Sequence, residues 1–180
     1  MKEHKNSVEQ SLPVEIERKF LIEYLDITCL KEKYPCQKLE IVQTYLVPKN
    51  EGEETRVRSI CANGIYKYTK TTKKKITDIK RTEVEKTISR EEYEKELESA
   101  DRGKAPVCKT RYCIMYQGKK LEIDLYPFWK DKAVMEIELY DENERFSIPE
   151  EIKVIKEITG DENYKNSAIA KLMLQNKEKN

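Results

Sequence analysis

The chain has 180 residues, enough for one domain with a substantial core, whereas two independent domains would be cramped. Its 35 Lys and Arg residues balance 34 Asp and Glu residues, so the net charge of +1 creates no field that would attract nucleic acid or a membrane surface. We therefore expect neither partner, and any charge-based function must depend on local clusters. The pattern predicts no particular oligomeric state. We expect residues 1–12 to form a flexible segment and residues 13–177 to form a single domain.

The cysteines and the single histidine argue against a zinc site. His4 lies near the N-terminus, and the sequence contains no Cys-x-x-Cys pair among Cys29, Cys36, Cys61, Cys108 and Cys113. No apolar signal core and no apolar stretch of membrane-spanning length is present. The composition therefore predicts a cytoplasmic protein whose cysteines are packed or incidental thiols.

Alternation of apolar and polar residues with a period of two predicts eight strands. They are expected at residues 14–22, 41–47, 54–61, 65–71, 82–88, 107–116, 119–126 and 133–140. Asn63-Gly64 and Gln117-Gly118 predict two hairpin turns. Because few helices separate the strands, neighbours should pair antiparallel, and closure into a barrel would leave no exposed edge.

A few helices are expected to flank this sheet. Ser89 and Glu92 have the spacing of a capping box, and Tyr93 and Leu97 follow as an apolar stripe. Shorter helices are expected at residues 141–146 and from Pro149, and a terminal helix at residues 166–174. The predicted fold class is α+β: an eight-stranded antiparallel closed barrel with flanking helices.

Charged residues recur two positions apart on one face of six predicted strands. They are Glu15, Glu17 and Lys19; Arg56 and Arg58; Glu83 and Glu85; Lys109 and Arg111; Glu122 and Asp124; and Glu136 and Glu138. The opposite faces are often apolar, as in Ile123 and Leu125. If the apolar faces pack under helices, the charged faces must line the barrel interior, where acids and bases compensate one another, hydrate, or bind ions and ligands. For any one pair a solvated strand face is the more common explanation, but six pairs on six strands weaken that explanation sharply.

The two signs of charge favour an anion bound together with a metal ion. Carboxylates without His or Cys suit a hard cation such as Mg²⁺ or Mn²⁺. Arginines and lysines converging from other strands suit phosphate oxygens. Since the chain has no glycine-rich phosphate loop, side chains would hold such a ligand.

The same residues resemble the CYTH superfamily, the triphosphate tunnel metalloenzymes. Glu15-x-Glu17-x-Lys19 is similar to the first-strand signature of that family. Further motifs follow in the family's order almost end to end: Gln43-Thr44-Tyr45-Leu46, Arg56-Val57-Arg58, Tyr68-Thr69-Lys70, Arg81-x-Glu83-x-Glu85, Lys109-x-Arg111-Tyr112, Leu121-Glu122-Ile123-Asp124, Met135-Glu136-Ile137-Glu138 and residues 160–166. The resemblance implies a CYTH-like tunnel domain over residues 13–177, which takes a small-molecule triphosphate and uses Mg²⁺ or Mn²⁺.

Residue roles follow from the resemblance. The implied metal ligands are Glu15, Glu17, Asp124, Glu136 and Glu138. The implied phosphate-binding residues are Lys19, Arg56, Arg58, Lys70, Arg111 and Lys165. Lys109 and Tyr45 are further candidates, because both are predicted to point inward and to act on the bridging or leaving oxygen; a packed aromatic is an equal explanation for Tyr45. Glu17 or Glu138 is a candidate to position or deprotonate the attacking water, and Glu17 is taken as the catalytic residue. Glu83, Glu85 and Glu122 are expected to line the tunnel without an assigned role.

The first and last motifs most resemble the small bacterial branch linked to inorganic triphosphate, which implies hydrolysis of that compound to diphosphate and phosphate. The fold alone does not choose a reaction, so a class IV-type adenylate cyclase, a thiamine or nucleoside triphosphatase, and a non-catalytic polyphosphate or nucleotide sensor remain alternatives. The His-Phe motif associated with bacterial class IV cyclases is missing, which favours a phosphohydrolase.

Lys73-Lys74-Lys75, which follows the fourth predicted strand, is expected to be a solvated loop.

Overall fold

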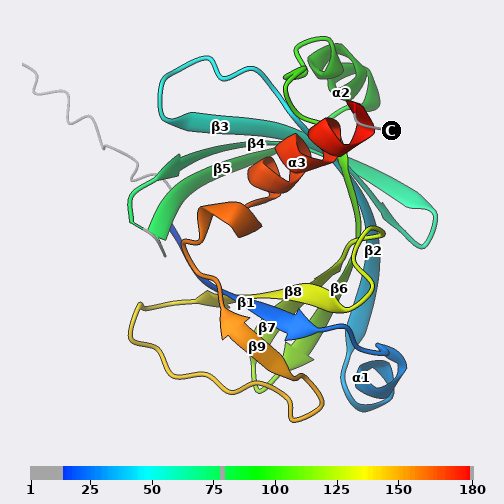
Figure 1. Ribbon diagram of the computed structural model, residues 1–180, viewed down its shortest axis with the longest axis vertical. Coiled ribbons are helices and arrows are strands. Elements are labelled where there is room, and N and C mark those ends of the chain that lie inside the picture. Colours follow the sequence, from blue (N-terminus) through cyan, green and yellow to red (C-terminus); the bar gives the residue numbers. More distant parts are fainter. Residues whose placement is uncertain (1–13, 78–79, 179–180) are drawn as a thin grey trace, which may run out of the picture.

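The computed structural model describes residues 14–77 and 80–178 (Figure 1). The predicted flexible segment 1–12 and His4 lie outside the described residues. Among the helices that are described, none has the length and apolar character needed to cross a membrane.

Eight antiparallel strands form a closed barrel, which confirms the predicted fold class. They are β1 (Val14–Glu23), β2 (Cys36–Tyr45), β3 (Glu53–Ala62), β4 (Ile65–Lys75), β5 (Lys80–Ile88), β6 (Val107–Tyr116), β7 (Lys119–Leu125) and β8 (Lys132–Leu139). The strand order is β5-β4-β3-β2-β6-β7-β8-β1, and the barrel closes because Val14 of β1 pairs with Thr82 of β5. Both predicted hairpins are present, with Asn63 and Gln117 at positive φ before Gly64 and Gly118.

One edge of β1 pairs with β8, and its other edge pairs with two different strands. Its first residues pair with β5, whereas Phe20, Leu21 and Ile22 pair with a ninth strand, β9 (Val154–Glu157). The helices expected at residues 141–146 and from Pro149 are absent. Phe146 and Ile148 are two positions apart, a strand-like spacing, and they pack as an irregular segment on the outer face of the barrel.

Three α-helices and one short 3₁₀ helix flank the barrel. They are α1 (Thr28–Lys33), α2 (Arg90–Leu97), α3 (Asn166–Glu178) and η1 (Glu162–Tyr164). The predicted capping box of α2 is confirmed, because Ser89 Oγ accepts from the Glu92 amide at 3.1 Å and Glu92 Oε2 accepts from the Ser89 amide at 2.8 Å. Helix α1 is not predicted by the sequence, because it has no side-chain cap and contributes only Leu30 to the core.

The largest apolar cluster lies on the outside of the barrel. It comprises the alternate residues of β1, β6, β7 and β8 that include Phe20, Ile114, Ile123, Met135 and Ile137. Leu30 of α1 and the irregular segment with Phe146, Ile148 and Ile152 cover it. Since neighbouring residues on a strand point to opposite faces, this packing turns the charged residues inward. A smaller cluster joins β3 and β4 to α2.

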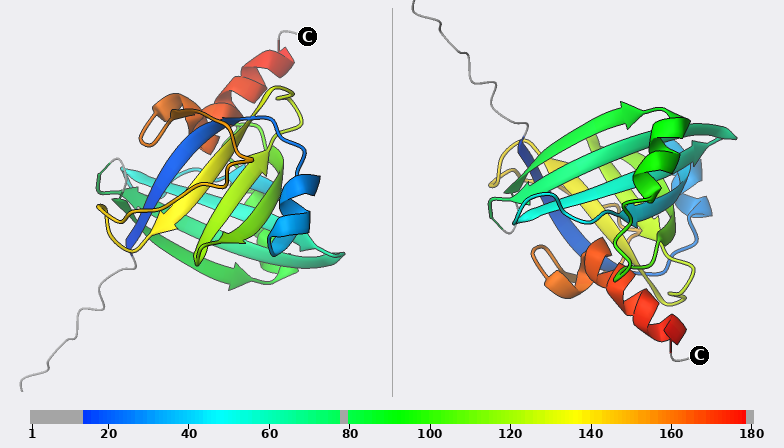
Figure 2. Two further views of the ribbon diagram at one scale, coloured as in Figure 1. Left: turned by 90° about the horizontal axis from the view of Figure 1, so that it is seen from below. Right: turned by 90° about the horizontal axis from the view of Figure 1, so that it is seen from above.

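One end of the barrel interior is closed by apolar side chains. Leu21, Val107, Tyr126 and Val134 meet Ile158, Ile169 and Ala170 from the C-terminal region. Tyr126 donates a hydrogen bond from its hydroxyl to Asn166 Oδ1 at 2.7 Å, and Trp129 packs beside Tyr126 at 5.0 Å between ring centroids. Figure 2 shows α3 lying at this end. The remaining interior is polar.

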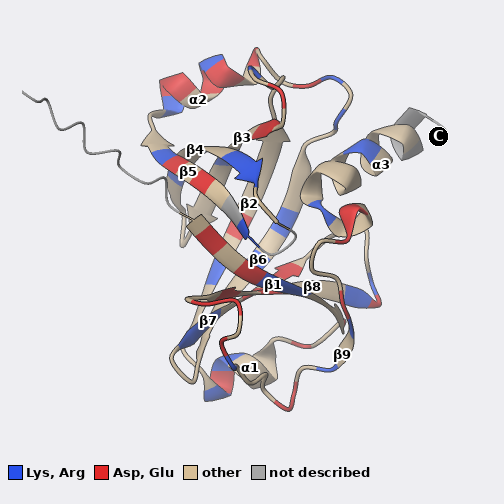
Figure 3. Ribbon diagram, turned by 90° about the vertical axis from the view of Figure 1, so that its left-hand side faces the viewer, with Lys and Arg blue, Asp and Glu red and all other residues tan. Residues whose placement is uncertain are grey.

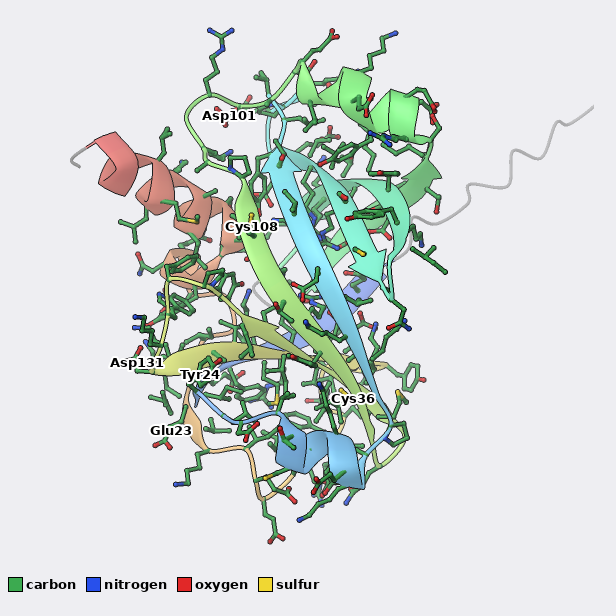
Figure 4. The ribbon with its side chains drawn as sticks, turned by 90° about the vertical axis from the view of Figure 1, so that its right-hand side faces the viewer. Glu23, Tyr24, Cys36, Asp101, Cys108 and Asp131 are labelled. Atoms are coloured by element: carbon green, nitrogen blue, oxygen red, sulfur yellow. The ribbon has the colours of Figure 1, made fainter. Side chains whose placement is uncertain are left out.

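All five cysteines are free thiols. Figure 4 shows Cys36 beside α1 and Cys108 near the other end of β6, consistent with a register that pairs Cys36 with Ile114 and Cys108 with Val42. Because these two thiols lie at opposite ends of the β2–β6 pair, they do not form a shared metal site.

Candidate functional site

A cavity of about 470 Å³ occupies the polar part of the barrel interior. All eight barrel strands contribute to its lining, and residues 158–161, 165 and 166 complete the wall. Figure 3 shows bands of acidic and basic residues along these strands. The volume of the cavity suits a small-molecule ligand, and charged side chains dominate its lining.

Arginines and lysines from β3 and β4 form one side of the cavity, held by carboxylates of β5. Arg56 lies 3.4 Å from Glu83 Oε1, and Glu83 also pairs with Lys73. Burial raises the pKa of Glu83, but Lys73, a hydrogen bond with Glu15 and the charge of Arg56 together outweigh burial and lower that pKa to about 2. Arg58 lies 3.8 Å from Glu85, and burial beside Arg56 lowers the pKa of Arg58 to about 9. With these pKa values, Glu83 and Arg58 both stay charged at neutral pH.

Arg111 of β6 is surrounded by carboxylates. Its Nε and Nη2 atoms donate to the two oxygens of Asp124 at 2.6 and 2.7 Å, and Nη2 also donates to Glu136 at 2.9 Å. Glu122 pairs with its third nitrogen. Burial opposes the charged form, yet the carboxylates raise the pKa of Arg111. The guanidinium is thus fixed in place at the cavity wall.

Lys109 and Asp124 are on the inward faces of their strands but do not line the cavity. Lys109 Nζ lies 2.5 Å from Asp124 Oδ2, and both side chains are fully buried. Burial and the nearby Arg111 lower the pKa of Lys109 to about 7. The two residues are next to the apolar plug, the cluster of Leu21, Val107, Tyr126 and Val134 with Ile158, Ile169 and Ala170 that closes one end of the barrel, because Lys109 Nζ is 6.0 Å from the centroid of the Tyr126 ring. This corrects the expectation that both would face a ligand directly, since Asp124 is occupied by Lys109 and Arg111.

Carboxylates from β1 and β8 form the acidic side of the cavity. Glu17 is directly opposite Glu138 in the β1–β8 pairing, and Glu15 lies on the same face of β1. Like charges placed opposite each other repel unless a cation is shared between them. Glu138 also lies 3.7 Å from Lys120, whereas Glu136 is engaged by Lys19 at 2.8 Å.

The donor chemistry of these residues fits a hard divalent cation, because the acidic side supplies oxygen atoms only. Glu15, Glu17, Glu136 and Glu138 all line the cavity and supply carboxylate oxygens of this kind. Lys19 and Arg111 also contact Glu136, and Lys120 lies near Glu138. In the conformers described, no three acidic, histidine or cysteine side chains are gathered closely enough to form a metal site.

The structure brings most of the predicted site residues to the cavity. Those that line it are Glu15, Glu17, Lys19, Tyr45, Arg56, Arg58, Glu83, Glu85, Arg111, Glu122, Glu136, Glu138 and Lys165. Lys165 lies at the C-terminal part of the wall, with its Nζ 2.7 Å from Glu162. Tyr45 is almost fully buried, and burial together with the nearby Glu54 raises its pKa above the usual range.

Lys70 does not reach the cavity. It lies on the outer face of β4, where its Nζ is 2.5 Å from Glu96 of α2. The cavity is lined instead by Lys73 and Lys75, which extend β4 and do not form the solvated loop expected from the sequence. The alternation of β4 with a period of two predicts the inward direction of these lysines, because Lys73 and Lys75 follow the buried Thr69 and Thr71 on the same face.

No protein-family model and no curated protein sequence matches this chain significantly. Solved structures do match. A structure of NE1496 is 27% identical with a TM-score of 0.54, covering 87% of this chain and 97% of that chain. A structure of the same protein named as the inorganic triphosphatase NE1496 is 27% identical with a TM-score of 0.53, covering 87% and 94%.

More distant structures share the fold. The PH1819 protein from Pyrococcus horikoshii OT3 is 20% identical with a TM-score of 0.53, covering 71% of this chain and 80% of its own. A candidate adenylate cyclase from Vibrio parahaemolyticus is 12% identical with a TM-score of 0.50, covering 71% and 79%. The resemblance to CYTH-like proteins inferred from the sequence is therefore confirmed as a structural match.

Proposed function

We propose that this chain, which has the fold of CYTH-like proteins, is a metal-dependent triphosphatase that hydrolyses inorganic triphosphate to diphosphate and phosphate. The observation that carries the proposal is a single cavity lined both by arginines and lysines, among them Arg56 and Arg58 of β3 and Lys73 of β4, and by carboxylates, among them Glu17 of β1 and Glu138 of β8. The similarity to a structure named as an inorganic triphosphatase supports the same reaction.

The basic residues of the cavity are suited to bind the phosphate chain. Arg56 and Arg58 present guanidinium groups, and Lys19, Lys73 and Arg111 add charge from neighbouring strands. Bound phosphate oxygens would replace part of the carboxylate contacts that these cations make in the ligand-free site. Because the cations are already fixed by Glu83, Glu85 and Glu136, their positions need little rearrangement when charge develops on the leaving diphosphate.

The acidic side is suited to hold Mg²⁺ or Mn²⁺ through Glu15, Glu17 and Glu138, with Glu136 as a further oxygen donor. When bound, such a cation neutralises phosphate charge and supports attack by water. We assign to Glu17 the positioning of that water, because it faces Glu138 across the two strands. Tyr45 is assigned as a hydrogen-bond donor to a phosphate oxygen, since its raised pKa keeps the phenol protonated at neutral pH.

Lys109 and Asp124 act indirectly in this proposal. They lie behind Arg111, and Asp124 accepts from both basic residues. Their contribution is to hold the Arg111 guanidinium against the cavity. Lys70, on the outer face beside α2, is given no role in phosphate binding.

The test is a product analysis with purified protein. Phosphate release should be measured from inorganic triphosphate, ATP, thiamine triphosphate and long-chain polyphosphate, each with Mg²⁺, with Mn²⁺ and with a chelator. We expect fastest turnover on inorganic triphosphate and loss of turnover with the chelator. Cyclic AMP and diphosphate formed from ATP would instead identify a cyclase, and tight binding of the anions without any product would identify a sensor.

A further inference from the structure

We propose that Gln43 is a positioning residue that fixes the hydroxyl of Tyr45 as a hydrogen-bond donor toward the ligand in the cavity. The inference rests on the proposed function, because it assigns a task in binding and turnover of the same triphosphate. It concerns a residue that does not itself line the cavity.

Gln43 is fully buried, and both ends of its amide are engaged. Arg58 Nε donates to Gln43 Oε1 at 2.9 Å, and Gln43 Nε2 donates to the Tyr45 oxygen at 2.7 Å. The amide thus connects a basic residue of the cavity wall with the only tyrosine that lines the cavity among the described residues.

The chemistry of the neighbours sets the direction of both hydrogen bonds. An arginine side chain only donates, so the amide oxygen of Gln43 must face Arg58. The amide nitrogen therefore faces Tyr45, and it has only protons to offer. The phenol oxygen consequently accepts, and its single proton has to be donated elsewhere.

The Tyr45 hydroxyl can donate this proton to a ligand bound in the cavity. Among the described residues, none accepts a hydrogen bond from the Tyr45 hydroxyl, while the Tyr45 side chain forms part of the cavity wall together with Arg56 and Arg58. A phosphate oxygen is a strong, charged acceptor that would complete this arrangement. Burial and Glu54 raise the pKa of Tyr45, so the proton stays on the phenol at neutral pH.

The experiment is a double-mutant cycle between positions 43 and 45. In Gln43→Glu, a carboxylate of equal size still accepts from Arg58 but also accepts the tyrosine proton, turning it away from the cavity. We expect Gln43→Glu and Tyr45→Phe each to lower kcat on inorganic triphosphate about 100-fold, the scale of losing one oriented donor. The double variant should be no slower than Tyr45→Phe alone. Multiplied effects would overturn the proposal.

Gln43→Met separates orientation from packing. Methionine has a similar size but no strong acceptor, so the tyrosine hydroxyl remains able to turn toward the ligand. Because nothing then holds the hydroxyl in one direction, we expect kcat to fall about tenfold, less than in Gln43→Glu, and an unchanged kcat would overturn the positioning role. A loss as large as that of Gln43→Glu would show a purely structural role and overturn the proposal. Gln37→Glu, the same substitution at an exposed position of β2, is the matched control and should leave turnover unchanged.

Failure of the proposed function can be distinguished from failure of this inference. If the unmodified protein turns over triphosphate but the cycle is additive, only the inference fails. If it binds inorganic triphosphate by calorimetry without turnover, the proposed function fails, and the same cycle is then read from the dissociation constants. Non-additive losses of affinity there support the role of Gln43, and additive losses overturn it. Absence of both binding and turnover overturns both proposals.

Discussion

The two faces of β8 differ in character: the outer face is apolar and packed, and the inner face is charged and lines the cavity. Its outer residues, Ala133, Met135 and Ile137, are fully buried in the largest apolar cluster, whereas Glu136 and Glu138 on the inner face line the cavity. The barrel is therefore apolar outside and charged inside over this half, with its covering layer supplied by α1 and residues 146–152. We infer that stability depends mainly on the outer face and ligand chemistry on the inner face.

Arg111 is the residue where this division should fail most strongly. It lies on the inner face, yet its removal leaves the fully buried Asp124 with Lys109 as its remaining cationic partner. We expect Arg111→Met to lower the free energy of unfolding by about 3–5 kcal/mol, the cost of breaking a buried ion pair. Chemical denaturation measures this change. Arg90→Met on the exposed surface of α2 is the control, and a loss as small as that of the control would contradict the expectation.

Ile137→Ala tests the outer face by itself. Ile137 is fully buried in the apolar cluster, and truncation of such a residue costs about 2–5 kcal/mol of stability. We expect the melting temperature to fall while kcat, measured well below the transition, stays within about twofold. Ile65→Ala, at a position that is 76% exposed, should change neither quantity. A large loss of kcat in folded Ile137→Ala protein would mean that the two faces are coupled.

Glu17→Gln tests the inner face by itself. The substitution removes one of two carboxylates that face each other across β1 and β8. We expect kcat on inorganic triphosphate to fall about 100-fold, with little change in melting temperature, because the site loses charge but no apolar packing. Glu23→Gln, at the exposed end of the same strand near Tyr24 and Asp131 (Figure 4), should retain full turnover. Equal activity of the two variants would remove Glu17 from the site.

The barrel and most of its inner face could be predicted from the sequence because strand periodicity is a local signal. The inward direction of Glu15, Glu17, Arg56 and Glu138 follows once one face of each strand is known to be apolar. The depth of a side chain along the barrel axis, in contrast, depends on distant residues and is not predicted by local periodicity. Asp124 and Glu122 share a face of β7, but only Glu122 lines the cavity, because the plug formed with α3 covers the level of Asp124.

Other differences have equally specific causes. Strand β9 has only four residues, all of them exposed, so no alternation of buried and exposed positions predicts it, and its pairing with β1 defines it as a strand. Gln43 belongs to the motif Gln43-Thr44-Tyr45-Leu46, but its role depends on contacts with Arg58 and Tyr45 that no spacing predicts. In β4, the motif Tyr68-Thr69-Lys70 implied a phosphate contact for Lys70, but Lys70 lies on the outward face, one position away from the buried Thr69 and Thr71.

That one-position difference gives the most selective test of which face meets the ligand. Lys73 lies inward beside Glu83, and Lys70 lies outward beside Glu96, so each has a carboxylate partner. We expect Lys73→Met to raise KM for inorganic triphosphate about tenfold, the effect of losing one charge-assisted contact to phosphate, and Lys70→Met to leave KM unchanged. Steady-state kinetics on the two variants measures the difference. The two substitutions are chemically identical and differ only in the side of the strand that they change. A larger rise in KM for Lys70→Met than for Lys73→Met would therefore place the phosphate-binding face of β4 on the outside of the barrel. That result would contradict the division between the inner and outer faces.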